Sequence, residues 1–156
     1  MSTKLDFNNL TFDELDQQVM EKLVFDDNEN SPILKGHLFV EKVLETLISK
    51  NLSKPKSFFK SRRTFELKID LAKAMGLIDE KYESAFKALN RIRNNYAHKG
   101  DYHVTVEELN SFKFEWEDIQ NQAFDRACTK GAGEAAKIAT IFLCWKAIHL
   151  ISAPQA

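Results

Sequence analysis

The chain has 156 residues, of which 44% are hydrophobic, and its 22 basic residues nearly balance 23 acidic ones, leaving a formal net charge of −1. These values exclude a disordered chain. They also exclude a protein that binds nucleic acid over its whole surface, so any such site has to be a local basic patch. They predict one soluble globular domain over residues 1–156, with residues 1–10 flexible.

Cysteine usage and hydropathy predict the compartment. Cys128 and Cys144 form neither a CxxC pair nor a disulfide framework, and the first residues lack the apolar run of a signal peptide. The most apolar segment, Ile138 to Ile151, has 14 residues interrupted by Lys146 and His149, whereas about 20 are needed to span a bilayer. We therefore expect a cytoplasmic protein that does not enter a membrane.

Two helices are predicted before residue 50. Thr11 and Glu14 fit a capping box at the start of the first helix, and apolar residues follow at helical spacing. Ser31 and Pro32 supply an N-cap residue and a first-turn proline for the second helix.

A basic loop and a third helix are predicted next. The segment from Lys50 to Arg63 contains six basic residues, no acidic ones and Pro55, which favours a loop. Thr64 begins the third helix, and Gly76 is placed to end it through a left-handed cap.

The second half of the chain predicts three more helices. A fourth helix starts near Asp79 and stops at Gly100, and a long fifth helix runs from Thr105 to Ala123. Alternating aromatic residues at positions 112 to 116 would also fit a strand, but the run has no glycine or proline and favours a helix. A glycine-containing turn at residues 130–133 leads to the last helix. The expected fold is an all-α, single-domain bundle of about five to six helices.

The end of the fourth helix holds the most informative residues. No P-loop, GxGxxG turn, CxxC zinc site, HExxH motif or nucleophile context is present, so most common enzyme classes lack support, and no metal or cofactor is expected. The segment from Arg91 to Gly100 gathers two arginines, two asparagines and a histidine. Compensation of the helix dipole, worth ~0.3–1 kcal/mol for each cation, would explain the basic residues without any chemistry.

This segment resembles the signature of the HEPN superfamily, which consists of small all-α proteins. The run from Arg93 to His98, RNNYAH, matches the form in which four residues separate arginine and histidine, with a polar residue after the arginine. The run from Phe65 to Ile78, followed by an acidic helix start and then the motif, resembles the layout of mannitol operon repressor proteins, which are grouped with the HEPN fold. The resemblance covers about residues 34–108.

The resemblance implies a metal-independent endoribonuclease, such as a toxin or defence RNase. His98 would act as general acid or base, Arg93 would stabilise the phosphorane, and Asn94 would complete the catalytic set. A 2′,3′-cyclic phosphate end would result. RNA would be the substrate, and a protein antitoxin or regulator a possible partner. Residues expected to support the site are Glu41, which would orient Arg93, together with Asn95, Tyr96 and His103.

Helix geometry predicts that one chain does not complete this site. Residues five apart on an α-helix are rotated by about 140° net, so Arg93 and His98 do not share a face, whereas Asn94 and His98 do. A homodimer in which both copies contribute to one site is therefore expected; the family is known for this arrangement, and two-fold dimers are the commonest oligomers.

Other polar groups have competing interpretations. His37, Glu41 and Glu45 lie at i, i+4 and i+8, which favours a solvated polar face over a metal site. His149 is expected to be a core histidine, and both cysteines to be structural. The basic segment is either an RNA-binding loop that stacks a base or a loop that docks its phenylalanines on the core; its candidate RNA-binding residues are Lys56, Lys60, Arg62 and Arg63.

Two non-catalytic functions remain open. In one, the chain is a transcriptional regulator of the mannitol-repressor type, and the face from Arg93 to His98 binds a protein or nucleic-acid partner. The lack of a helix-turn-helix signature argues against direct reading of the DNA major groove. In the other, the chain is a structural interaction protein, and the motif only caps its helix.

Overall fold

A computed structural model describes residue 14 and residues 31–152 of the chain. This part forms seven α-helices and one 3-10 helix and contains no β-strand, so the all-α bundle is confirmed. None of these helices is both long enough and apolar enough to cross a membrane. The predicted flexible residues 1–10 and the helix predicted from Thr11 lie outside the described residues, apart from Glu14.

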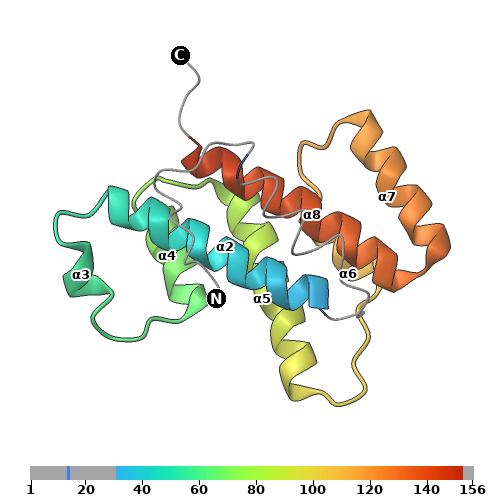
Figure 1. The fold of residues 1–156 in the computed structure, drawn as a ribbon, viewed down its shortest axis with the longest axis horizontal. Coiled ribbons are helices and arrows are strands. Elements are labelled where there is room, and N and C mark those ends of the chain that lie inside the picture. The colour runs from blue at the N-terminus through green and yellow to red at the C-terminus, as the bar shows by residue number, and fades with distance from the viewer. Residues whose placement is uncertain (1–13, 15–30, 153–156) are drawn as a thin grey trace.

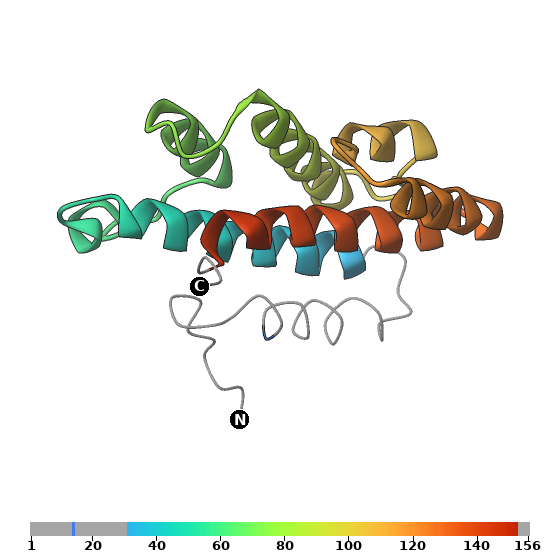
Figure 2. The ribbon, with the colours of Figure 1, turned by 90° about the horizontal axis from the view of Figure 1, so that it is seen from above.

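Helices α2 (Ser31–Lys50) and α8 (Ala132–Ile151) lie side by side in one layer (Figure 2). Their close approach depends on Gly36, because a Cβ atom at this position would lie 2.2 Å from Cγ2 of Thr140. All six residues from Ala139 to Cys144 are buried, so the middle of α8 is covered on every side.

Helices α4 (Phe65–Ala74) and α5 (Glu80–His98) pack across one face of this layer (Figures 1 and 2). Both begin where the sequence predicts. Thr64 Oγ1 accepts a hydrogen bond from the Leu67 N–H at 3.1 Å, and the Asp79 carboxylate accepts from two N–H groups of the first turn of α5. Gly76, with φ of 73°, follows the end of α4 in the left-handed conformation, as predicted.

The segment between α2 and α4 is mostly a loop, but it contains one helical turn, α3 (Pro55–Phe58), which the prediction missed. Proline suits this first turn because it has no N–H to leave unpaired there. Arg63 fastens the loop, since its Nε donates to the Phe58 carbonyl at 2.9 Å and its guanidinium lies 4.8 Å from the Phe58 ring centre.

The predicted long fifth helix is wrong. The chain instead forms α6 (Val106–Leu109), a 3-10 turn η1 (Asn110–Phe112), an irregular stretch and α7 (Asp118–Lys130). Glu115 adopts a left-handed φ of 54°, and Lys81 and Lys146 hold its carboxylate and carbonyl at 2.6 Å and 3.0 Å. Tertiary contacts therefore overrode the local helical pattern, and they turn Phe114 and Trp116 onto the core.

In the C-terminal part, the predicted boundary before the last helix is confirmed, and the predicted burial of one histidine is wrong. Gly131 separates α7 from α8, as predicted, and Cys144 is fully buried. His149, expected in the core, is exposed, because the apolar residues that flank it in sequence occupy the buried side of α8 near its end.

Candidate functional site

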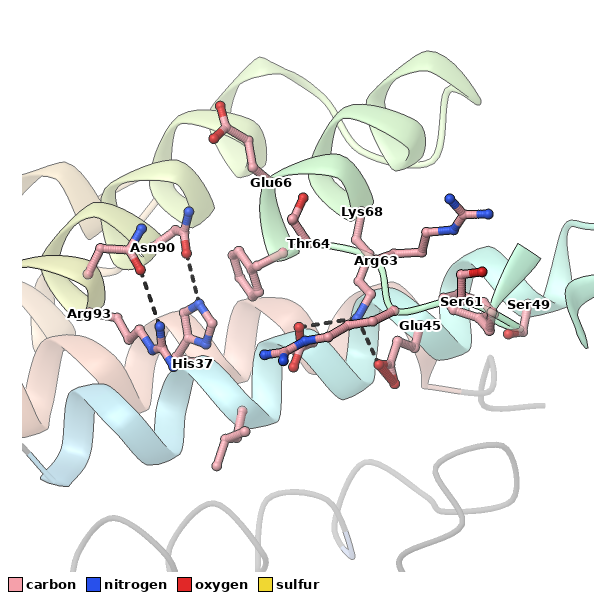
Figure 3. Close-up of a pocket in the computed structure, with 16 residues that line it drawn as sticks. His37, Glu45, Ser49, Ser61, Arg63, Thr64, Glu66, Lys68, Asn90 and Arg93 are labelled. Atoms are coloured by element: carbon pink, nitrogen blue, oxygen red, sulfur yellow. Dashed lines mark hydrogen bonds and ion pairs between the residues drawn. The ribbon is translucent and has the colours of Figure 1, made fainter. Parts of the chain in front are cut away.

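Four segments enclose an open groove of about 860 Å³ (Figure 3). Helix α2 contributes one wall, and the end of the basic loop, the start of α4 and the middle of α5 contribute the rest. The groove contains four cationic residues and three carboxylates; these are Arg62, Arg63, Lys68 and Arg93, and Glu41, Glu45 and Glu66. It is therefore a polar, mixed-charge site with a small excess of positive charge.

The α2 wall is the stripe that was expected to be solvated. His37, Glu41, Glu45 and Ser49 follow one another at intervals of four residues, and all of them line the groove. The prediction of a solvated face is wrong for His37, which is only 6% exposed because α4 and α5 pack over this side of α2, whereas Glu41 and Glu45 remain partly exposed. The stripe extends about 18 Å along the helix, at about 1.5 Å per residue.

His37 is held between α4 and α5. Its Nε2 donates to Asn90 Oδ1 at 3.0 Å, and its ring stacks on Phe65 with centres 4.0 Å apart. Burial lowers the pKa of His37; the nearby Arg93 lowers it further, while the hydrogen bond to Asn90 acts in the opposite direction. The imidazole is therefore neutral near pH 7 and is oriented by Asn90.

Lys68 lies in the middle of the groove and is only 5% exposed (Figure 3). Its Nζ donates to Glu41 Oε2 at 3.1 Å and to Glu45 Oε1 at 3.0 Å. A nearly buried ammonium group needs such partners, since an unpaired charge would be costly to desolvate. This cluster ties α4 to α2 and leaves the two carboxylates partly open to the groove.

Arg93 and Asn94, predicted as catalytic residues, both line the groove. Arg93 Nη1 donates to Asn94 Oδ1 at 3.3 Å. Asn90 precedes them by three and four residues, so the three side chains share one face of α5. This end of the groove offers a guanidinium group, two side-chain amides and a neutral imidazole. These groups are suited to binding a ligand that carries an anionic group beside other hydrogen-bonding atoms.

The other residues predicted at this helix end lie outside the groove. His98 is the last residue of α5 and is exposed, and His103 is exposed in the following loop. Tyr96 has a structural role, because its hydroxyl accepts a hydrogen bond from the Val104 N–H at 3.2 Å. Arg93 therefore lines the groove of its own chain, while His98 lies outside it.

Asn95 and Tyr96 belong to a network that holds the loop after α5. Tyr102 packs edge-on against Tyr96, with ring centres 4.8 Å apart, and its hydroxyl donates to Glu108 in α6. Burial and this hydrogen bond raise the pKa of Tyr102 to about 12, against a lowering contribution from Asn95. The network fixes where the loop leaves α5 and so where His98 is presented.

The candidate RNA-binding residues separate into two groups. Arg62 and Arg63 line the groove at the end of the loop, whereas Lys56 and Lys60 are exposed on the loop outside it. Of the loop's phenylalanines, Phe59 packs against the core and lines the groove. The loop thus both docks on the bundle and supplies cations to the groove.

Sequence reasoning missed Lys68 and Asn90 and misjudged His37. Lys68 lies on the apolar stripe of α4, between the buried Phe65 and Ala72, and a lysine on such a stripe is a signal for a buried ion pair. Asn90 shares the face of Arg93 and Asn94. In the described part of the chain, no group of three or more metal-ligating side chains lies close enough together to hold an ion.

Comparison with known proteins adds no assignment: no family model, curated protein or solved structure matches this chain.

Proposed function

We propose that this chain is an RNA-binding protein that cleaves its substrate as a metal-independent endoribonuclease of the HEPN type, in a dimer. The observation that carries the proposal is the placement of α5, which directs Arg93 and Asn94 into a groove that also contains Arg62 and Arg63. Guanidinium groups bind phosphate oxygens through paired hydrogen bonds, so the groove supplies affinity for a nucleic-acid backbone.

Cleavage requires a group that transfers protons. In the proposed reaction, the ribose 2′-oxygen attacks the neighbouring phosphorus while His98 takes the hydroxyl proton, and the bond from phosphorus to the 5′-oxygen breaks as that oxygen takes a proton from water. Arg93 stabilises the extra negative charge on the phosphorane. The products are a 2′,3′-cyclic phosphate and a 5′-hydroxyl.

The position of His98 is the reason for proposing a dimer. It is exposed at the end of the helix whose middle lines the groove, and helical geometry rotates it away from Arg93. A second copy related by a two-fold axis brings His98 of one chain toward Arg93 of the other.

The cleavage test uses end-labelled mixed RNA with purified protein in EDTA. The wild type is expected to cut the RNA and to leave cyclic phosphate ends. His98→Ala and Arg93→Ala should each lower the rate by ~100-fold or more, while His98→Ala changes stability by no more than ~1 kcal/mol. His149→Ala is the matched control, because it removes another exposed histidine, on α8, and should leave cleavage unchanged.

Mixing the two inactive variants tests the shared site. If each active site takes Arg93 from one chain and His98 from the other, half of the re-formed dimers are mixed and carry one intact site, restoring about a quarter of the wild-type rate. Absence of any recovery, with dimers shown to exchange, would contradict the shared site.

A non-catalytic regulator is the alternative, and one observation favours it. His37 is the one imidazole among the described residues of the groove, and it is nearly buried and engaged by Asn90. A chain acting alone would therefore bind a ligand in the groove without a histidine that is free to act as general acid or base. Wild-type protein that cleaves no RNA tested, alone or after release from a bound partner, would replace the nuclease with this regulatory function.

A further inference from the structure

The polar groups of the groove follow a definite order along α2 (Figure 3). His37, Asn90 and Arg93 lie at one end, Glu45 and Lys68 lie in the middle, and Ser49 and Ser61 lie at the other end, where the cationic end of the loop enters. In the middle, the two carboxylates Glu41 and Glu45 outnumber the one ammonium group of Lys68, and this excess of negative charge between two cationic ends weakens the binding of a uniformly anionic ligand. The two carboxylates fit a ligand that carries a hydrogen-bond donor between two anionic groups.

Of the two carboxylates that α2 contributes to the groove, Glu41 has capacity left for such a donor. Both oxygens of Glu45 face cations, with Oε1 at 3.0 Å from Lys68 Nζ and Oε2 at 3.6 Å from Lys42 Nζ. Among the described residues, Glu41 forms an ion pair through Oε2 alone, at 3.1 Å from Lys68 Nζ. Its side chain is 24% exposed and lines the groove one helical turn from His37.

A nucleic-acid backbone has the matching order. Each sugar lies between two phosphates, and only in RNA does that sugar carry a 2′-hydroxyl that can donate a hydrogen bond. We infer that Glu41 makes this groove selective for RNA over DNA by accepting a hydrogen bond from a ribose 2′-hydroxyl. This inference rests on the proposed binding of nucleic acid in the groove.

The physical basis is a difference between two ligands at the same carboxylate. With RNA, the hydroxyl proton offsets the repulsion between Glu41 and the flanking phosphates. With DNA, the carboxylate is desolvated beside phosphates and gains no hydrogen bond. A hydrogen bond to a charged group is expected to give about a tenfold or larger preference for RNA.

The test measures fluorescence anisotropy of three labelled single strands of one sequence: RNA, DNA and fully 2′-O-methylated RNA. The protein carries His98→Ala, which prevents cleavage without altering the groove. RNA is expected to bind about ten times more tightly than either of the other strands. The methylated strand lacks the 2′-hydroxyl donor but keeps a ribose sugar, so it separates the effect of losing the donor from the effect of the different sugar shape of DNA.

Glu41→Gln should bring the RNA preference below about threefold, because a neutral acceptor forms a weaker hydrogen bond and no longer repels DNA. Glu45→Gln is the matched control: it removes the same charge and also weakens one partner of Lys68, but should strengthen binding of both strands and keep their ratio. Circular dichroism and thermal melting establish that both variants are folded. If Glu41→Gln does not fold, the methylated strand alone decides, since binding equal to that of RNA refutes the inference.

Two failures are distinguishable. If RNA is cleaved and bound but DNA binds equally well, or if Glu41→Gln keeps the full preference, the inference is wrong and the proposed function stands. If no single strand binds, and no RNA is cleaved by the wild type, the proposed function itself fails.

Discussion

Gly36→Ala should destabilise the protein even though alanine is the better helix former. The added methyl group would lie 2.2 Å from Cγ2 of Thr140, far inside van der Waals contact, at the place where α2 crosses α8. Thr140 has little freedom to move, because it is fully buried and its hydroxyl donates to the Ala136 carbonyl at 2.6 Å. The two helices must separate to accept the methyl group.

The magnitude follows from two opposing contributions. Overpacking of this kind costs about 2–3 kcal/mol, and replacing a mid-helix glycine by alanine recovers up to about 1 kcal/mol. The expected net loss for Gly36→Ala is about 1–2 kcal/mol. Thr140→Ser removes the clashing methyl group and keeps the hydroxyl, so alone it should cost about 1 kcal/mol of lost burial.

The double variant makes the test specific. With the serine in place, the new alanine methyl group occupies the space that the threonine methyl group left. The double variant should therefore have nearly wild-type stability, and the coupling between the two changes should be about 2–3 kcal/mol. Urea unfolding followed by circular dichroism at 222 nm gives all four free energies. Additive losses, or a stabilised Gly36→Ala single variant, would refute the proposed contact between α2 and α8.

Two further predictions concern the groove. Lys68→Met should lower the free energy of unfolding by about 1–2 kcal/mol, which is less than for a fully buried pair because Glu41 and Glu45 keep partial solvent access. Adding Glu41→Gln and Glu45→Gln should recover part of this loss in urea unfolding. If the loss is not recovered, repulsion between the two carboxylates is excluded as its cause. The folded-state pKa of His37 is lowered, so the unfolded chain binds more protons, and the free energy of unfolding should fall as pH falls below the unfolded pKa of about 6.5. The unfolding midpoints of the wild type and of His37→Gln should therefore converge as pH is lowered from 7.5 to 5. Parallel curves would show that His37 does not titrate in this way.

Several of the residues that begin or end helices were predictable from the sequence. Thr64, Asp79 and Thr105 cap helices where the sequence places their caps, and Gly76 ends α4 as predicted. These signals work because a cap is a hydrogen bond between groups only two or three residues apart. The choice of Arg93 and Asn94 as site residues was likewise available from the sequence, and the structure places both in the groove.

Features that depend on partners distant in the chain were decided only by tertiary structure. His37 bonds Asn90 across a separation of 53 residues, and Lys68 reaches Glu41 across 27, so a stripe that looks solvated by its own spacing becomes a groove wall. The break at Glu115 is of the same kind, since lysines from α5 and α8 hold it. Helix periodicity records which side chains share a face, whereas burial depends on what packs against that face, and this is fixed only when the helices meet.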